Sequence, residues 1–315
     1  MSSFLFVTPT WDAKLWAGEM QKAMPALDVR VWPDVGDPAT IDYVAAWLPP
    51  PNVVKSLVNL KVIFSLGAGV DAILGDPTLP RHVPIVRVND LDLTNRMSEY
   101  IVLHCLMHHR QQRKLDQQQK ENVWDSFPTH AASAMTVGVM GLGVMGHDAA
   151  RKLKIMGFNV VGWSRSAKHL EGITCFAGAA GLDDFLSHTD ILVVLLPATP
   201  ETDGILNRAL FRKLSRKGPF GAAILINAGR GRQQVEEDIV AALDAGELHA
   251  ATLDVFRKEP LPADSPLWNH PKVTLTPHAA ADSEPSVICA YVAERIKSFE
   301  HDGTLNNLVD HARGY

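Results

Sequence analysis

Short apolar runs alternate with helical stretches through the first 88 or so residues of the chain. Each run has the length and character of a buried strand, and the stretches between the runs have helical spacing. The runs are Phe4–Val7, Val29–Trp32, Tyr43–Trp47, Val62–Leu66 and Ile85–Arg87. Because alternating strands and helices build parallel βα units, this part of the chain predicts one α/β lobe.

A second series of the same kind begins at Thr136. Its apolar runs predict six parallel strands, which is the usual content of a dinucleotide-binding sheet. The six runs are Thr136–Met140, Asn159–Trp163, Ile191–Leu196, Ala222–Asn227, Ala250–Asp254 and Val273–Thr276. The pattern therefore predicts a second α/β lobe.

Two helices are predicted where one lobe gives way to the other. The first covers about Thr94–Arg110, has Ser98 and Glu99 near its start, and is expected to bridge the lobes. The second follows Pro285 and stops at Gly303. Its apolar stripe consists of Ile288, Val292, Ile296 and Phe299. We expect this helix to return to the first lobe.

Together these patterns predict an α/β protein with two Rossmann-like or flavodoxin-like lobes. Each lobe is expected to be a parallel sheet flanked by helices, with the active-site cleft between the lobes. Residues 1–98 with 285–315 are predicted to form a flavodoxin-like substrate-binding domain, and residues 99–284 a dinucleotide-binding Rossmann domain. A length of 315 residues suits two domains.

Composition and charge narrow the range of functions. With 46% hydrophobic and 21% charged residues, the chain has the composition of a folded protein and not of a disordered one. Its net charge of −5 gives no polycationic surface for nucleic acid or an anionic membrane. No apolar run approaches the roughly 20 residues of a membrane helix, and the N-terminus has the pattern of a strand and not of a signal peptide. The three scattered cysteines suit a reducing compartment, so we expect a cytoplasmic protein without a metal site.

Six residues with three glycines, Gly141-Leu142-Gly143-Val144-Met145-Gly146, lie between a predicted strand and a predicted helix. This context is typical of a dinucleotide-binding turn. Its glycines allow the turn, the close approach of a pyrophosphate and tight helix packing, and the helix N-terminus stabilises negative charge. The helix is expected to bury Ala149, Leu153 and Met156 and to stop at Gly157. A plain βα turn is the alternative interpretation.

The end of the next strand indicates which dinucleotide is bound. NAD sites place an acidic residue about 20 positions after the glycines, but here the chain reads Ser164-Arg165-Ser166. A carboxylate would repel the 2′-phosphate of NADP, whereas Arg165 can pair with it and the serines can donate hydrogen bonds. We therefore predict NADPH, with NADH weaker, and Lys168 as a second cation. We also assign Leu196, Pro197 and Ala228 to the cofactor site.

Three ionisable residues follow successive predicted strands of the second lobe. They are Arg230, Glu259 and His278. Because the carboxyl ends of parallel strands meet at one edge of the sheet, these residues are expected to converge beside the nicotinamide. Taken singly, each has an ordinary alternative as a surface or structural residue.

Three segments carry a resemblance to a known family: Asn227-Ala228-Gly229-Arg230-Gly231, Leu253-Asp254-Val255-Phe256 through Glu259-Pro260-Leu261, and Thr276-Pro277-His278. They resemble the signatures of the D-isomer-specific 2-hydroxyacid dehydrogenases, and the similarity spans nearly the whole chain. The glyoxylate/hydroxypyruvate reductase A branch is resembled more narrowly by Ser65-Leu66-Gly67-Ala68-Gly69-Val70-Asp71, by Trp47 and by Ala312-Arg313-Gly314-Tyr315. NAD-type members of the family have an acidic residue where this sequence has Ser164.

The resemblance implies reduction of small 2-oxo acids such as glyoxylate and hydroxypyruvate to 2-hydroxy acids. His278 would be the general acid, Glu259 would orient its ring, and Arg230 would bind the substrate carboxylate or keto oxygen. Asp254 would bind the nicotinamide carboxamide. On the substrate side, backbone N–H groups would come from Ala68, Gly69 and Val70, and Trp47 would form a wall of the pocket. A homodimer is also implied, with Trp124 as one suspected contact.

Two other functions stay open. One is an NAD-linked D-2-hydroxyacid dehydrogenase with a different substrate. The other is a dinucleotide-sensing, corepressor-like binding protein on the same scaffold. A turnover assay with both cofactors separates these alternatives.

Overall fold

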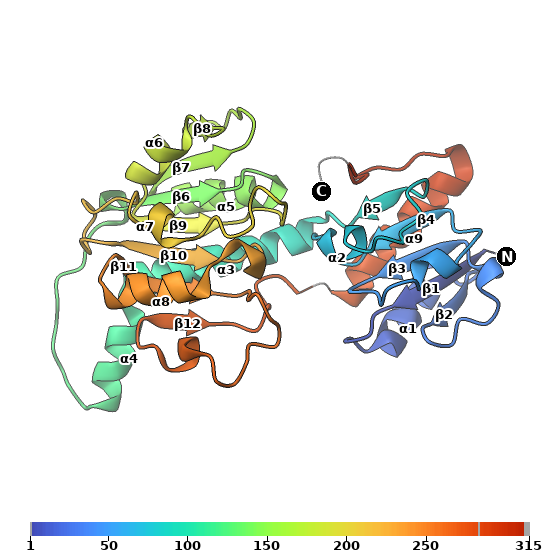
Figure 1. Ribbon diagram of the computed structural model, residues 1–315, viewed down its shortest axis with the longest axis horizontal. Coiled ribbons are helices and arrows are strands. Elements are labelled where there is room, and N and C mark those ends of the chain that lie inside the picture. Colours follow the sequence, from blue (N-terminus) through green and yellow to red (C-terminus); the bar gives the residue numbers. More distant parts are fainter. Residues whose placement is uncertain (1, 283, 312–315) are drawn as a thin grey trace. The chain divides into compact units, whose positions relative to one another are not determined.

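The computed structural model describes residues 2–282 and 284–311 and divides the chain into two compact units (Figure 1). The first unit comprises Met1–Leu93 and Asp282–Tyr315, and the second comprises Thr94–Ala281. The predicted borders, 98/99 and 284/285, each lie a few residues later in the sequence than the borders in the structure. The first border falls inside α3, Leu91–His109, whose helical pattern continues across it without a break. The segment Ala312–Tyr315 lies outside the described residues.

The first unit is built on a five-stranded parallel sheet in the order β2-β1-β3-β4-β5. All five strands fall where apolar runs predict them. Its strands and helices are β1 Ser3–Val7, α1 Ala13–Ala23, β2 Asp28–Val31, β3 Tyr43–Ala46, β4 Val62–Ser65, α2 Asp71–Leu74, β5 Ile85–Arg87 and α9 Pro285–Asp302. Short 3₁₀ turns occupy Pro38–Thr40 and Val54–Ser56.

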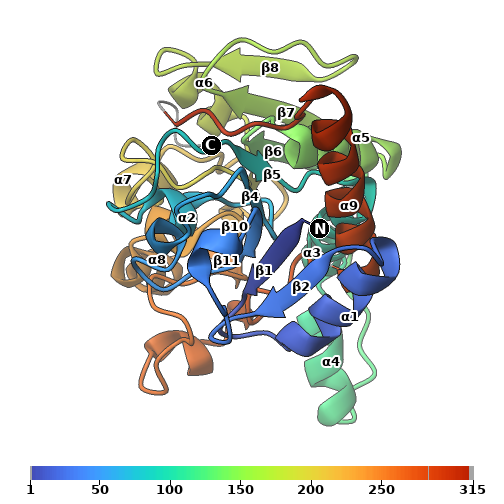
Figure 2. The same cartoon turned by 90° about the vertical axis from the view of Figure 1, so that its right-hand side faces the viewer.

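Both faces of this first sheet are covered. Side chains alternate along β1, so Leu5 and Val7 enter one core while Phe6 faces the other side and lies 6.2 Å from the ring of Trp16 on α1. α9 lies against α1 (Figure 2) and buries three residues of its predicted stripe, Ile288, Val292 and Ile296. α9 ends at Gly303, as predicted, because this residue takes the left-handed conformation with φ +77°. The predicted return of this helix to the first lobe is confirmed.

The second unit contains a seven-stranded parallel sheet in the order β12-β11-β10-β9-β6-β7-β8. Its strands are β6 Thr136–Met140, β7 Asn159–Ser164, β8 Thr174–Ala177, β9 Ile191–Val194, β10 Ala223–Asn227, β11 Leu248–Leu253 and β12 Val273–Leu275. Besides most of α3, its helices are α4 Gln112–Lys120, α5 Val144–Ile155, α6 Leu182–Ser187, α7 Arg208–Phe211 and α8 Glu236–Asp244. The 3₁₀ turns are Ala132–Ala134, Gly231–Gln233 and Pro266–Asn269.

Two details of the second unit differ from the sequence prediction. The expected six strands omit β8, an edge strand of four partly exposed residues whose short polar-apolar run has no clear strand pattern. Met156, which was expected on the buried face of α5, is 44% exposed because it lies just past the last helical residue, where the backbone turns away. Ala149 and Leu153 are buried as predicted.

The second sheet separates two hydrophobic cores, because neighbouring residues of each strand face opposite sides. Ile191 and Val193 of β9 pack in the core formed with α3 and α5. Leu192 and Val194 pack in the core formed with α6, α7 and α8. Each fully buried aliphatic side chain contributes roughly 1.5–3 kcal/mol to the free energy of folding. The sheet is therefore a rigid support for the loops at its carboxyl edge.

Within the described part of the chain, no helix combines the length and the apolar character that crossing a bilayer requires.

Candidate active site

The strand order of the second unit reverses beside β6, and the loops that follow β6 and β9 touch there. β7 and β8 lie on one side of β6, whereas β9 to β12 lie on the other. A Cβ on Gly141 would lie 2.6 Å from the carbonyl oxygen of Leu195, so little room separates the two loops. In open parallel sheets, ligands bind at the carboxyl ends of the strands at such a reversal.

The three glycines of the loop after β6 have different surroundings. Gly141 has φ +112°, which L side chains rarely adopt, and Gly146 lies so close to the Gly141 carbonyl that a Cβ would collide with it. Gly143, in contrast, has extended backbone, and a Cβ there would meet nothing within 4 Å. Among the residues that the structure describes, no packing contact explains a glycine at position 143, and the open space beside its backbone at the start of α5 fits a bound pyrophosphate.

The other residues of this loop can contribute to a ligand site in different ways. Leu142 is buried and packs against Gly162 of β7, so only its backbone faces the loop. Met145 packs against the core beside α5, and the side chain of Val144 is 53% exposed. These neighbours shape the loop, and the backbone at Gly143 is the part of the loop that a ligand can approach.

The end of β7 presents a cation and hydroxyls, with no carboxylate between Ser164 and Lys168. The Ser164 hydroxyl is buried and donates to the carbonyl of Ser166 at 2.7 Å, which closes the turn. Arg165, Ser166 and Lys168 are exposed. The pKa of the Glu201 carboxyl is lowered, first by a hydrogen bond from Thr199 and also by the charge of Arg165. Arg165 is thus electrostatically coupled to the loop after β9.

The loops after β9 and β10 are joined through Gln233, which is completely buried. Its Nε2 donates to the carbonyls of Leu196 at 2.7 Å and Pro197 at 3.2 Å, and its Oε1 accepts from the backbone N–H of Arg230 at 3.0 Å. The side chains of Leu196 and Ala228 are buried. These two residues can therefore line a cofactor site only with backbone and a small part of their surface.

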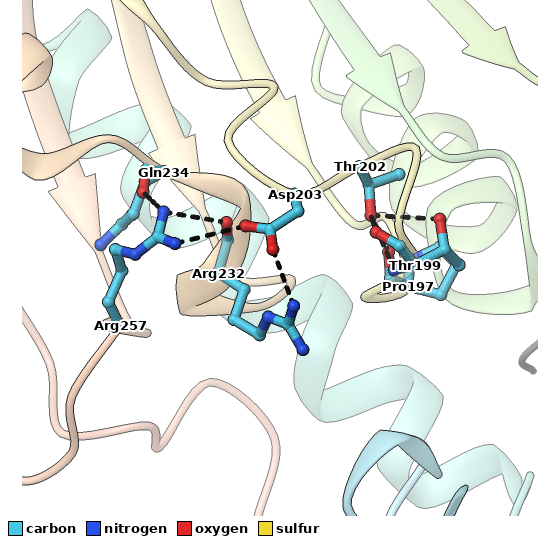
Figure 3. A network of polar contacts seen from close by, with 7 residues as sticks. All are labelled: Pro197, Thr199, Thr202, Asp203, Arg232, Gln234 and Arg257. Carbon is cyan, nitrogen blue, oxygen red and sulfur yellow. Dashed lines mark hydrogen bonds and ion pairs between the residues drawn. The ribbon is translucent and has the colours of Figure 1, made fainter. Parts of the chain in front are cut away.

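A polar network at the surface ties together the loops that follow β9, β10 and β11 (Figure 3). Asp203 accepts hydrogen bonds from Arg232 at 2.7 Å and from Arg257 at 3.3 Å, and Arg257 also donates to the carbonyl of Gln234 at 3.0 Å. The bond from Arg232 is the main reason that the pKa of Asp203 is lowered. The network therefore holds the chain just after Arg230 and just before Glu259.

Glu259 and His278 come from different loops and form one hydrogen-bonded pair. His278 Nδ1 lies 2.8 Å from Glu259 Oε2, and both side chains are about one-third exposed. The other oxygen of Glu259 accepts from the backbone N–H of Phe256 at 2.9 Å. An ionised carboxylate only accepts hydrogen bonds, so Nδ1 carries the proton in this pair. Nε2 is then the nitrogen that can exchange a proton with a substrate.

The electrostatic balance keeps Glu259 ionised. Burial raises the pKa of its carboxyl, but the hydrogen bonds from His278 and Phe256 and the charges of His278 and Arg230 outweigh burial and lower the pKa overall. Arg230 is partly exposed, and its guanidinium also donates to the carbonyl of Gly229 at 2.8 Å. The structure thus brings a carboxylate, an imidazole and a guanidinium from three loops into one electrostatic cluster.

His278 has a left-handed backbone, with φ +56°, which costs a non-glycine residue about 1–3 kcal/mol. Asp254 stabilises this conformation. Its carbonyl accepts from the His278 N–H at 2.8 Å, and its carboxylate accepts from Ala279 N–H at 2.9 Å and from Ala280 N–H at 3.1 Å. Asp254 is only 1% exposed, so most of its carboxylate is engaged with its own chain.

The predicted substrate-binding residues of the first unit lie at the ends of neighbouring strands. Trp47 follows β3, stacks on Trp11 at 5.0 Å, and packs so closely on Gly67 that a Cβ there would lie 2.5 Å from its ring. The loop 68–70 connects β4 to α2, and the Ser65 hydroxyl holds the carbonyls of Gly67 and Gly69 at 3.0 and 2.9 Å. Trp47 and this loop are therefore adjacent within the first unit.

Three residues support the site although the sequence patterns predict no role for them: Gln233, Tyr100 and Thr276, the last being part of the family-like segment before His278. The Thr276 hydroxyl donates to Asp254 at 2.6 Å and lies 2.8 Å from the Tyr100 hydroxyl. A signal existed for Gln233, since Gln233 and Gln234 directly follow the glycine-rich segment around Arg230. Nothing in the local pattern of α3 marks Tyr100, because its partners lie more than 150 residues away.

Comparison with known proteins gives consistent results along the chain. The model of the D-isomer specific 2-hydroxyacid dehydrogenase NAD binding domain matches residues 102–280. A glyoxylate/hydroxypyruvate reductase A from Yersinia enterocolitica is 41% identical over 318 residues, which cover 99% of this chain and 100% of that protein.

Solved structures agree over the full length. The NADPH-dependent glyoxylate/hydroxypyruvate reductase from Sinorhizobium meliloti, in complex with NADP and sulfate, is 45% identical, covers 100% of both chains and has a TM-score of 0.95. A probable 2-hydroxyacid dehydrogenase from Rhizobium etli in complex with NADP, HEPES and L(+)-tartaric acid is 44% identical with a TM-score of 0.93, covering 100% of this chain and 99% of that one.

Proposed function

Because the chain belongs to the D-isomer specific 2-hydroxyacid dehydrogenase family, we propose that it reduces glyoxylate, hydroxypyruvate and similar small 2-oxo acids with NADPH. The protein is an oxidoreductase of the NAD(P)-dependent type. The observation that carries the proposal is the hydrogen bond between His278 and Glu259, with the charge of Arg230 acting on the same carboxylate. Relatives that are named for this activity or bind NADP support the choice of substrate and cofactor.

When bound, NADPH would supply the hydride that reduces the keto carbon. The exposed backbone of Gly143 and the N-terminus of α5 would hold its pyrophosphate, and Arg165 and Ser166 would hold its 2′-phosphate, with Lys168 as a second cation. Leu196, Pro197 and Ala228 would supply backbone to the site, and the assignment of Asp254 to the nicotinamide carboxamide is part of the proposal.

His278 supplies the proton that the keto oxygen needs as it becomes a hydroxyl group. Glu259 holds Nδ1–H, which fixes the tautomer and directs Nε2 to the substrate, and its negative charge stabilises the protonated ring before the proton leaves. Arg230 offers a planar pair of N–H donors that orient the substrate carboxylate and polarise the carbonyl. In the first unit, the N–H groups of Ala68, Gly69 and Val70 are assigned to the substrate carboxylate and Trp47 to limiting its size.

The direct test is the oxidation of NADPH or NADH, followed by absorbance, with glyoxylate, hydroxypyruvate, pyruvate and phenylpyruvate as substrates. We expect the highest kcat/KM with NADPH and one of the first two acids. Faster turnover with NADH would favour an NAD-linked dehydrogenase. Tight NADPH binding without turnover of any of the four acids would favour a dinucleotide-sensing protein and overturn the proposed activity.

Replacing Arg165 with alanine is expected to raise the KM for NADPH about tenfold and to leave the KM for NADH nearly unchanged. A charge-assisted hydrogen bond to phosphate is worth about 1.5–3 kcal/mol. Because Arg165 is exposed, we expect an effect at the lower end of this range. Steady-state kinetics with each cofactor measures the difference. The control is Arg212→Ala, another exposed arginine, which pairs with Glu247. Equal effects of Arg165→Ala on both cofactors would contradict the phosphate assignment.

Replacing Glu259 with glutamine is expected to lower kcat for the reduction of 2-oxo acids about tenfold, with little change in the KM for NADPH. The lowered pKa of Glu259 keeps its carboxylate ionised and able to accept the Nδ1–H of His278. The neutral amide removes this negative charge and can present its NH₂ group to Nδ1, so the tautomer of the ring is no longer fixed. Steady-state kinetics measures the loss, and Asp183→Asn, at an exposed carboxylate, serves as the control. An unchanged kcat would show that the carboxylate does not act through His278.

We further propose that two copies of the chain form a dimer through the segment after α4. Trp124 is fully exposed, its chain neighbour Val123 adds apolar surface, and Leu115 of α4 is also exposed. An exposed tryptophan presents a large apolar area whose burial against a partner is favourable. Sedimentation velocity is expected to give twice the chain mass of 34.5 kDa, and a monomer at micromolar concentration would contradict the proposal.

The three free thiols support placing the enzyme in the cytoplasm, which cell fractionation tests.

A further inference from the structure

A pair of hydroxyl groups connects α3 to the loop that carries His278. The Thr276 hydroxyl donates to Asp254 Oδ1 at 2.6 Å, because a carboxylate can only accept. The Tyr100 hydroxyl lies 2.8 Å from the same Thr276 oxygen. Since the Thr276 proton is already committed to Asp254, Tyr100 must be the donor in this second bond. The bonds therefore run in one direction, from Tyr100 to Thr276 to Asp254.

The Tyr100 side chain is buried and contacts a neighbouring ring, which fixes its hydroxyl as a donor. Its side chain is 9% exposed, and its ring lies 4.2 Å from the imidazole of His104, one turn further along α3. Burial raises the pKa of the phenol, the hydrogen bond with Thr276 opposes burial less strongly, and the charge of Asp254 adds a smaller increase. Tyr100 thus keeps its proton and donates throughout the neutral range.

The carboxylate at the end of this chain holds the backbone on both sides of His278. Thr276 precedes His278, and Ala279 and Ala280 follow it, and all three donate to Asp254. Thr276 and Ala279 share Oδ1, whereas Ala280 binds Oδ2. One carboxylate therefore binds residues on both sides of His278, which is the geometry that supports its left-handed conformation.

We propose that Tyr100 and Thr276 are positioning residues, whose hydroxyl groups orient Asp254 so that the His278 loop is held in its proton-donating conformation. The proposal rests on the proposed function, because it assigns the purpose of the loop from the role of His278. A side chain that only fills space at these two positions would need no hydroxyl, since valine and phenylalanine have nearly the shape of threonine and tyrosine. The inference therefore concerns the hydrogen bonds and not the packing.

The test compares Thr276→Val, which removes the hydroxyl, with Thr276→Ser, which keeps it, and with Tyr100→Phe. The control is Thr274→Val, because Thr274 lies two residues earlier and its hydroxyl bonds Arg113 at 2.9 Å and not the loop. Hydrogen–deuterium exchange of the amides of His278, Ala279 and Ala280 reports the loop without substrate. Kinetics with NADPH deuterated at the transferred position reports the hydride step.

In Thr276→Val we expect faster exchange at these three amides, kcat about tenfold lower, a larger deuterium isotope effect and an NADPH dissociation constant within about twofold of the original protein. Tyr100→Phe should show the same changes at smaller size. Thr276→Ser and Thr274→Val should behave like the original protein in all four measurements.

Unchanged exchange at the loop in Thr276→Val would overturn the inference, as would equal effects of Thr276→Val and Thr274→Val. Faster exchange spread over the whole second unit would also overturn it, because that result indicates a structural role. If the original protein reduces no 2-oxo acid, the proposed function fails, but the exchange measurements still decide whether the hydroxyl pair holds the loop.

Discussion

Replacing His278 with asparagine is expected to lower kcat for glyoxylate reduction by about a thousandfold, while the dissociation constant for NADPH changes little. General acid catalysis typically contributes a factor of about 10²–10⁴, and asparagine cannot donate a proton in this way. Asparagine is chosen over alanine because it tolerates the left-handed backbone observed here, with φ +56°. The loss then reports the imidazole and not a rearranged loop. Steady-state kinetics and fluorescence titration of NADPH measure the two quantities.

The matched control is His188→Asn. His188 is exposed after α6, and its Nδ1 lies 2.7 Å from the backbone carbonyl of Asp184, so its replacement should leave kcat unchanged. Activity of His278→Asn within about tenfold of the original protein would remove His278 from the role of acid. Loss of NADPH binding together with kcat would instead assign His278 to the cofactor site.

The strands could be predicted because each buried strand of a parallel sheet is apolar on both faces. This holds for Ile191–Val194 and Ala223–Asn227, where every residue is buried. Thr174–Ala177 has no such signal because it pairs on one side only and stays partly exposed. Burial alone does not decide the prediction, however, because Asp28–Val31 is also an edge strand of partly buried residues and is predicted from its apolar run.

The approach of Glu259 and His278 could be anticipated from topology alone. β11 and β12 are neighbours in the sheet, so the loops that follow them begin at the same edge. The roles assigned to these residues stay predictions until variants are measured, whereas their hydrogen bond is a feature of the structure.

The contacts made by buried hydroxyl and amide groups could not be predicted in the same way. Tyr100 has an unremarkable position in a helical pattern, and its partner Thr276 is 176 residues away. A side chain of this kind has several possible acceptors and donors, and only the packing of α3 on the sheet selects one of them. Sequence patterns report burial and periodicity, but they contain no information on which distant polar groups meet.

Replacing Arg230 with lysine is expected to lower kcat/KM for glyoxylate by about 10²-fold, equivalent to about 2.7 kcal/mol of transition-state stabilisation. Both residues carry a positive charge, so the change isolates geometry. Lysine is a point charge, whereas the planar guanidinium can hold two oxygen atoms at once and keep the carbonyl aligned for hydride attack.

A matched control for Arg230→Lys is Arg232→Lys, because Arg232 lies two residues further along the chain and binds Asp203 at the surface. We expect kcat/KM of that variant to stay within about threefold of the original protein, since exposed ion pairs are worth about 1 kcal/mol or less. The KM for NADPH should be the same in all three proteins. If Arg230→Lys retained full kcat/KM, positive charge alone would suffice at this position, and the substrate carboxylate would have to be oriented by other residues, with the N–H groups of Ala68, Gly69 and Val70 as the next candidates to test.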